Sequence, residues 1–502
     1  MVDEPGASGL RTGGRRVRIA VIGAGAGGIC VTKDLLDAGF EDVVVLERNE
    51  GVGGTWLINR YPGCECDVQS ALYSFSWAPK PDWSKPYGTQ PEILDYLCRL
   101  AEAHGVLSHS RFGVTVTGAT WHAGTSTWRV ATSSGADVEA EVLVAAVGMF
   151  REPSLPDIEG IDTFGGTMFH SALWDGDHDL SDERVAVIGS AASAVQLVPQ
   201  VAKVAGRLHL FQRTPNWVLP KIDDPYSEEE LAHQRDHPEI QAAFRAEIYR
   251  HMDAGMTFAD PAPLAERESA ALDAMAVVED PAVRAALVPD HPFGCKRPLF
   301  SNNYYPTFNL PTVELVTDRI DRIVPEGVVT DDGTLREVDT ILLATGFSTT
   351  RYVSSTDVTG RDGRRLAEEW ADGAQAYLGI ATPGFPNLFM LYGPNTNNGS
   401  ILTMLEAQST HIVSQVRRLR DEGLAWVDVR PEAAAAYDDE IQRGIAGVAV
   451  WQVDCGGYYR APSGRVVTQW PFSMTDYRER TETIDSGAFE CGPVATVIPA
   501  AG

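Results

Sequence analysis

Basic residues are scarce in this chain, and their scarcity limits the partners that it can have. The 502 residues contain 41 Lys and Arg against 69 Asp and Glu, which gives a formal net charge of −28. Binding to nucleic acid or to an anionic membrane needs a basic surface, so we expect neither. The sequence also lacks any apolar run that approaches the length needed to span a bilayer, which predicts a protein without a membrane segment.

Cysteine is rare as well, with seven residues, an odd number, scattered along the chain. Cys64 and Cys66 are separated by one residue, which is the wrong spacing for a redox pair or a zinc knuckle. We therefore predict reduced thiols and no metal site. The apolar stretch after Arg15 and Arg16 is interrupted at once by glycines, and no cleavage site follows. We expect a cytoplasmic protein rather than an exported one.

Residues 17–28 read VRIAVIGAGAGG and have the form of a strand and turn that bind a dinucleotide. Three glycines follow the strand in the pattern G-x-G-x-x-G: Gly23, Gly25 and Gly28. They permit a tight turn, a close approach of backbone to pyrophosphate, and helix packing. Glu47 ends the second strand, where a carboxylate holds ribose hydroxyls and repels a 2′-phosphate. This first site is therefore predicted to bind FAD rather than NADPH.

Residues 185–194, reading VAVIGSAASA, repeat this plan with alanine in place of two glycines. The residues predicted to contact the second nucleotide are Gly189, Ser190, Ala191, Ser193, Ala194 and Gln196. The next strand, 208–212, ends in Arg213 and Thr214 instead of an acid. An Arg fork can hold a 2′-phosphate with help from the Thr hydroxyl, which favours NADPH. The alternative for Arg213 is a surface ion pair.

Segment 164–175 lies between these two sites and reads FGGTMFHSALWD. It fits the pattern F-x-G-x-x-x-H-x-x-x-W-D, carried by Phe164, Gly166, His170, Trp174 and Asp175. Five defined positions in twelve rarely match by chance. At this point the chain resembles the type I Baeyer–Villiger monooxygenases. The resemblance implies an α/β fold with two Rossmann-like dinucleotide-binding domains, for FAD and NADP, and an inserted helical subdomain.

The resemblance also implies residues around the flavin. In the family, a segment like 53–67 of this chain wraps the flavin, and its Asp, here Asp67, faces the active site. The further FAD contacts implied are Gly54, Thr55, Trp56, Tyr73 and Met404. Relatives often have Glu where this chain has Gln69, which removes a charge near the site. The alternative role for Asp67 is a helix N-cap, and both roles can hold together.

The pair Lys296 and Arg297 lies in GCKRP, a segment that resembles the one presenting the family's catalytic Arg. The resemblance assigns Lys296 to the NADPH ribose phosphate and Arg297 to the reaction centre, oriented by Asp67. It implies that NADPH and O2 are used to insert oxygen beside a ketone carbonyl through a C4a-peroxyflavin, giving an ester or lactone. We expect His170 to act through hydrogen bonds that couple the position of NADP to domain rotation.

The chain is predicted to divide into six segments, because each nucleotide-binding domain is interrupted once. They are a disordered leader (1–16), the first segment of the FAD domain (17–152), the first segment of the NADP domain (153–222), a helical insert (223–290), the second segment of the NADP domain (291–338), and the second segment of the FAD domain with the C-terminal residues (339–502). The small-molecule ketone itself is not predicted, and a monomer and a homodimer are both open.

Three other classes are compatible with some of these features. A flavin monooxygenase that oxygenates nitrogen or sulfur shares both nucleotide sites, but it generally lacks the Trp174-Asp175 ending, and Arg297 is less expected in it. A disulfide reductase needs a redox Cys pair beside the flavin, which Cys64 and Cys66 do not provide. A non-catalytic binding protein is disfavoured by two intact cofactor sites.

Overall fold

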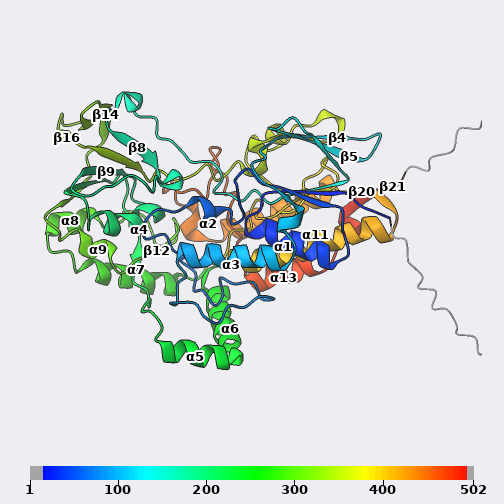
Figure 1. Ribbon diagram of the computed structural model, residues 1–502, viewed down its shortest axis with the longest axis horizontal. Helices are drawn as coiled ribbons and strands as arrows, with labels where there is room; N and C mark the ends of the chain where they lie inside the picture. The colour runs from blue at the N-terminus through cyan, green and yellow to red at the C-terminus, as the bar shows by residue number, and fades with distance from the viewer. Residues whose placement is uncertain (1–14, 495–502) are drawn as a thin grey trace, which may run out of the picture.

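Two parallel five-stranded sheets form the framework of the protein in a computed structural model, which describes residues 15–494 (Figure 1). The first sheet has the strand order β19-β7-β1-β2-β3, and the second has the order β13-β10-β9-β17-β8. The strands of the first are β1 (Ile19–Ile22), β2 (Val43–Leu46), β3 (Ser110–Arg111), β7 (Val142–Ala145) and β19 (Leu388–Met390). Those of the second are β8 (Thr167–His170), β9 (Arg184–Ile188), β10 (Arg207–Phe211), β13 (Val313–Val316) and β17 (Thr340–Leu343). The predicted pair of Rossmann-like units is confirmed.

In both sheets, the central strand is followed by a turn that begins with a glycine of positive φ. Gly23 follows β1 with φ of 100°, and Gly189 follows β9 with φ of 108°. A Cβ on Gly23 would lie 2.7 Å from the carbonyl oxygen of Ala146, and one on Gly189 would lie 2.4 Å from that of Ala344. Only glycine fits either turn. The helices α1 (Ala26–Asp37) and α4 (Ala192–Val201) begin three residues later in both units.

The fingerprint segment supplies the edge of the second sheet. Strand β8 pairs in parallel with β17, with His170 opposite Leu343. Strand β17 also pairs with β9. The predicted boundary at 338/339, which returns the chain to the FAD domain, is therefore one strand too early. The apolar sequence of β17 is typical of a buried parallel strand in either sheet, so the sequence alone does not distinguish the two.

Smaller sheets cover the edges of this framework. One has the order β18-β4-β5-β6 and another the order β14-β15-β16, while β11 pairs with β12 and β20 with β21. Their strands are β4 (Val116–His122), β5 (Thr127–Thr132), β6 (Val138–Ala140), β18 (Asp357–Thr359), β14 (Ile320–Val324), β15 (Gly327–Thr330), β16 (Leu335–Glu337), β11 (Val218–Leu219), β12 (Leu299–Phe300), β20 (Leu424–Val429) and β21 (Phe489–Pro493). These strands extend the framework without altering the two parallel sheets.

The predicted helical insert is confirmed as four helices: α5 (Glu228–Asp236), α6 (Pro238–Gly255), α7 (Pro261–Met275) and α8 (Pro281–Ala286). The last three begin with Pro, whose fixed φ suits the first helical position. In Figure 1, α5 and α6 lie below the two sheets. Strands β11 and β12, which precede and follow the insert, pair with each other, so its two ends lie together. Arg245 on α6 donates to the carbonyl oxygens of Ala71 and Ser74 at 3.0 and 2.7 Å.

The remaining helices pack mainly around the first sheet. They are α2 (Thr55–Ile58), α3 (Gln90–Ala103), α9 (Tyr304–Thr307), α10 (Leu366–Glu369), α11 (Ile401–Asp421), α12 (Pro431–Ala446) and α13 (Met474–Glu482). Helix α11 lies along α1, as Figure 1 shows. None of the helices in residues 15–494 is long and apolar enough to cross a membrane. Of the predicted leader, only Arg15 and Arg16 are described, while residues 1–14 lie outside the described range; Arg15 pairs with Glu141.

One cysteine prediction is wrong. Cys295 and Cys455 form a disulfide across a sequence separation of 160 residues. The tertiary fold brings the two residues together, so no local spacing reveals the pair. The other five thiols are free: Cys30, Cys64, Cys66, Cys98 and Cys491.

A buried carboxyl group on β20 is the basis of a stability prediction. Asp428 accepts a hydrogen bond from the Gly384 N–H at 3.1 Å and lies 3.5 Å from the Arg361 guanidinium. Burial raises the pKa of Asp428 to about 7, against the opposing charge of Arg361. An unfolded Asp has a pKa near 3.9. The folded state therefore holds an extra proton between these two values, and stability falls as the pH rises through that window.

We predict that Asp428→Asn removes this decrease of stability with rising pH. Relative to wild type, the variant should gain on the order of 2–4 kcal/mol of unfolding free energy between pH 4 and pH 8, because its amide needs no proton to be neutral. Denaturant titrations at several pH values measure this. Asp372→Asn, at an exposed position, is the control. Equal pH slopes in wild type and Asp428→Asn would contradict the prediction.

Candidate active site

The first nucleotide site is built from two glycine turns in contact. A Cβ on Gly54 would lie 2.8 Å from the Gly25 Cα, and one on Gly28 would lie 1.9 Å from the Gly23 carbonyl oxygen. The N-terminus of α1 has no side-chain cap. Bare backbone N–H groups at a helix start are the donors that a pyrophosphate takes. The residues present therefore fit FAD.

Glu47 is positioned at this same turn. Its side chain is buried, and one carboxylate oxygen accepts from the Ala24 N–H at 2.7 Å. The other oxygen accepts from the Asn49 backbone N–H at 2.8 Å. The carboxylate is thus fixed beside the glycine turn, at the position where such folds hold a ribose.

The predicted flavin-side residues lie on separate elements. The Trp56 indole N–H donates to the Tyr73 hydroxyl at 2.9 Å, which ties α2 to segment 59–78. Met404 is buried on α11, whereas Thr55 is exposed at the start of α2. Trp56 and Tyr73 are also both buried, so they form a rigid apolar wall.

The second nucleotide site repeats the first with alanines. Helix α4 begins beside Ala191 without a side-chain cap. Ser190 donates from its hydroxyl to the Thr214 carbonyl oxygen at 3.0 Å, which joins the two predicted loops. Ala194 is fully buried, while Ser193 is half-buried. The substitution of Gly by Ala leaves the strand–turn–helix geometry intact.

Arg213 and Lys296 are the two predicted cations of this second site. Burial, and then the positive charge of Arg213, lower the pKa of Lys296, so the two charges are close enough to repel each other. Neither cation makes a salt bridge within residues 15–494. Two uncompensated cations at a dinucleotide turn have the chemistry of a 2′-phosphate site. The residues present therefore fit NADPH.

The predicted reaction-centre residues are joined directly. Arg297 donates two hydrogen bonds to the two carboxylate oxygens of Asp67, both at 2.7 Å, from positions 230 residues apart. The Asp67 carboxylate raises the pKa of Arg297, so the guanidinium stays charged. Such a bidentate pair fixes both the position and the orientation of the positive charge.

Three tyrosines around Arg297 are not predicted from the sequence. Tyr392 is partly buried and Tyr459 is buried, and burial raises the pKa of both while the Arg297 charge opposes it. The Tyr458 hydroxyl is buried and has no hydrogen-bond partner among the described residues. These residues come from loops that are far apart in the sequence. Both loops lie in stretches that resemble the family, FPNLFMLYGPN and GGYYR, but the resemblance does not indicate that the tyrosines lie near Arg297.

His170 connects the fingerprint strand to the turn after β17. The Ala172 N–H donates to Nδ1 at 3.0 Å, so the proton of the neutral ring lies on Nε2. Nε2 then donates to the Gly346 carbonyl oxygen at 3.1 Å. Burial lowers the pKa of His170. Both ring nitrogens of His170 are therefore engaged in hydrogen bonds, which leaves neither of them free to accept a proton.

Gln196, a predicted contact of the second nucleotide, also makes hydrogen bonds to the flavin-side segment. Its amide oxygen accepts from the Tyr61 hydroxyl at 2.9 Å, and its NH2 donates to the Glu65 carbonyl oxygen at 2.9 Å. Both ends of the amide therefore engage the flavin-side segment. The residue joins the two nucleotide-binding units.

Cys64 and Cys66 do not have the properties of a redox pair. Both thiols are free and buried. Burial raises the pKa of Cys64 to about 12 and raises that of Cys66 further. Thiols of this kind are unreactive at neutral pH, which argues against a disulfide reductase. Among residues 15–494, no group of three or more His, Cys, Asp or Glu side chains is placed to hold a metal ion.

Two dinucleotide sites, a linking fingerprint strand and a partly buried arginine paired with Asp67 define a flavoprotein of the monooxygenase class. The family model described as flavin-binding monooxygenase-like matches residues 16–253. A Baeyer-Villiger monooxygenase from Streptomyces coelicolor is 40% identical over 481 residues, which cover 94% of this chain and 92% of that relative. The chain belongs to the Baeyer–Villiger monooxygenases.

Solved structures agree with this assignment. An oxidized steroid monooxygenase bound to NADP has a TM-score of 0.85 at 31% identity, covering 95% of this chain and 100% of that one. The OTEMO complex with FAD and NADP has a TM-score of 0.86 at 30% identity, covering 95% and 99%. The cofactors of this enzyme are FAD and NADPH.

We predict that His170→Ala lowers the free energy of unfolding by about 1–3 kcal/mol, because it leaves a buried N–H and a buried carbonyl without partners. Chemical denaturation of the holoenzyme measures this. His122→Ala removes an exposed ring on β4 and serves as the control. A His170→Ala protein as stable as that control would show that the two hydrogen bonds are not important for stability.

Proposed function

We propose that this enzyme inserts one oxygen atom of O2 beside the carbonyl of a small-molecule ketone, and that Arg297 provides the positive charge for this reaction. The bound cofactors supply reducing equivalents and activated oxygen. The observation that carries the proposal is the bidentate pair of Arg297 with Asp67. A fixed guanidinium stabilises the oxyanion that forms on the carbonyl oxygen when the ketone is attacked.

Asp67 has a positioning role in this proposal. Its two oxygens hold the guanidinium in one plane, so little reorganisation is needed when negative charge develops. The side chains of Asp67 and Arg297 are 25% and 29% exposed. The pair is therefore accessible to a substrate while its charge is only partly screened by water.

The cofactor contacts that we propose follow from the two fitted sites. The contacts to FAD are assigned to Gly23, Gly25, Gly28, Glu47 and Gly54, which form one continuous turn surface, and to Thr55, Trp56, Tyr73 and Met404 beside it. The contacts to NADPH are assigned to Gly189, Ser190, Ala191, Ser193, Ala194, Arg213, Thr214 and Lys296. Gln196 is also assigned to NADPH, and its amide joins the two units through Tyr61 and Glu65.

Oxygenation of nitrogen or sulfur is the alternative, and no feature of the site favours it over ketone oxidation. Support for the ketone comes from the relative in Streptomyces coelicolor and from the fixed guanidinium. We further propose a cytoplasmic protein that acts as a monomer or a homodimer.

We predict that Arg297→Ala retains FAD and still oxidises NADPH, but loses ester formation by about 10²–10³-fold in kcat, as when a preorganised charge donor is removed. Product analysis by gas chromatography, together with NADPH consumption, measures both effects. Arg250→Ala, which removes an exposed arginine on α6, should match wild type. Normal ester yield from Arg297→Ala would refute the assigned role.

We predict that Arg213→Ala and Lys296→Ala each lower kcat/KM for NADPH about 10- to 100-fold, because a charged hydrogen bond to phosphate contributes about 1.5–3 kcal/mol. The kcat/KM for NADH should change little, since NADH lacks the 2′-phosphate. Steady-state kinetics with both nucleotides decides the matter. Equal losses for NADPH and NADH would point to a general structural defect instead.

A further inference from the structure

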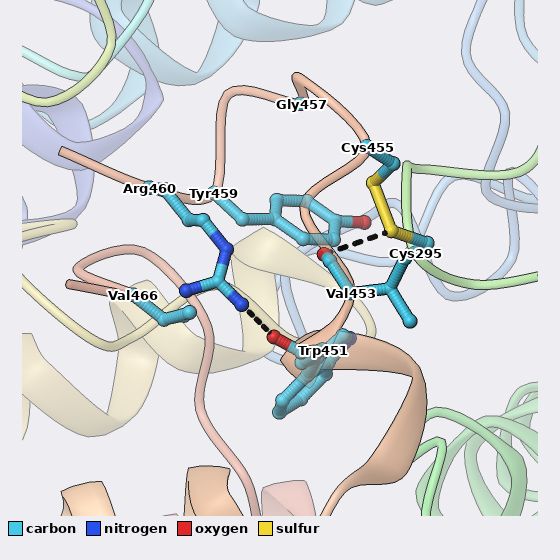
Figure 2. A pocket seen from close by; sticks show the side chains of 8 residues that line it. All are labelled: Cys295, Trp451, Val453, Cys455, Gly457, Tyr459, Arg460 and Val466. Atoms are coloured by element: carbon cyan, nitrogen blue, oxygen red, sulfur yellow. Dashed lines mark hydrogen bonds between the residues drawn. A yellow bond between two sulfur atoms is a disulfide. The ribbon is translucent and has the colours of Figure 1, made fainter. Parts of the chain in front are cut away.

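The Cys295–Cys455 disulfide lies next to the predicted catalytic pair. Cys295 directly precedes Lys296 and Arg297, and its partner belongs to the loop 453–457, which leads from η6 (Ala449–Gln452) to Tyr458 and Tyr459. Figure 2 shows the disulfide beside the ring of Tyr459. A cavity of about 10 Å³ between them is also lined by Trp451 and Arg460, so it has room for about one water at most.

Few other contacts hold this loop against the segment 293–297. A Cβ on Gly457 would lie 3.4 Å from the Lys296 Cγ, so the loop backbone lies against the lysine stem. Besides a contact of the Cys295 Sγ with the Val453 carbonyl oxygen, no hydrogen bond or ion pair among the described residues joins 453–457 to 293–297. Here the disulfide and packing contacts therefore attach the loop to the segment 293–297.

The two cysteine residues differ in their exposure. Cys295 is buried, at 3% exposed, whereas Cys455 is partly exposed between the exposed Asp454 and Gly456. An external thiolate can therefore approach the Cys455 sulfur, with the Cys295 sulfur as leaving group. The Cys295 Sγ already lies 3.3 Å from the Val453 carbonyl oxygen. Once reduced, this thiol has an acceptor for its S–H, so the site accommodates both redox states.

We propose that this disulfide is a redox-sensitive tether that positions Lys296 and Arg297 by fixing the loop 453–457 against them, and that a dithiol reductant opens it. One thiolate of the reductant attacks the Cys455 sulfur, and the Cys295 thiolate leaves and takes a proton. The second thiol of the reductant then resolves the mixed disulfide, releasing the Cys455 thiol. The dithiol becomes a disulfide as the protein gains two electrons and two protons.

Opening the tether should loosen the cofactor and reaction sites together. The loop continues into Tyr458 and Tyr459, beside Arg297, and it covers the stem of Lys296. This inference rests on the proposed function, because it uses the roles assigned there to Lys296 and Arg297. With the loop released, we expect weaker binding of NADP+ and a larger share of NADPH oxidised without formation of ester.

The test compares oxidised holoenzyme with holoenzyme reduced by dithiothreitol and desalted. After denaturation, thiol titration should give five thiols per chain in the oxidised form and seven in the reduced form. Calorimetric titration with NADP+ should show affinity at least about five-fold weaker after reduction, the lower range for coupling between sites. Reoxidation should restore it. Hydrogen peroxide released per NADPH should rise in parallel.

Cysteine variants distinguish the opening of the disulfide from other effects of the reductant. Cys295→Ser and Cys455→Ser should resemble reduced wild type and should not respond to dithiothreitol. Cys491→Ser, which removes an exposed free thiol on β21, should respond as wild type does. If a serine variant fails to fold, reduced wild type still provides the comparison.

The outcomes are distinguishable. Seven titratable thiols in the oxidised protein, or equal NADP+ affinity in both redox states, would overturn the tether. A loss of NADP+ affinity when Cys295→Ser or Cys455→Ser is treated with dithiothreitol would also overturn it, because these variants have no tether to open. Absence of ester from both forms of wild type, together with the predicted thiol counts and the affinity change, would instead overturn the proposed reaction while supporting the tether.

Discussion

The ion pair of Asp67 with Arg297 is the interaction on which the rest of the site depends. It joins the flavin-side segment to the segment that follows the helical insert, across 230 positions of sequence. A partly buried ion pair loses hydration on both partners, and only good geometry with hydrogen bonds compensates for that loss. The two parallel 2.7 Å bonds meet this condition, and they leave the guanidinium charged and fixed in direction.

Other contacts help to fix the positions of the two segments that carry Asp67 and Arg297. Glu65, two residues before Asp67, pairs with Lys221, which also pairs with Asp223 at 3.1 Å. The Glu65 carbonyl oxygen accepts from Gln196 on α4. On the other side, Lys296 directly precedes Arg297. These contacts connect the two nucleotide-binding units to the pair of Asp67 with Arg297.

The sequence predicts local features well and distant contacts poorly. The glycine turns at Gly23 and Gly189 are predictable because strand, turn and helix are consecutive and each step has a steric reason. The roles of Asp67 and Arg297 come only from resemblance, since no spacing rule spans 230 positions. The disulfide and the tyrosines near Arg297 depend on loops that meet only in the folded chain. Strand β17 is predicted in the wrong sheet, because the sequence of a buried apolar strand does not show which strands it pairs with.

The central claim, that Asp67 acts through Arg297, is tested most directly by a double-mutant cycle on kcat/KM for ester formation. The cycle uses Asp67→Asn, Arg297→Lys and the double variant, because Asn and Lys keep the approximate size of each side chain but not the bidentate charged pair. We predict a coupling energy of about 2 kcal/mol or more, within the range measured for close charge pairs. Additive effects, with a coupling energy near zero, would contradict the account.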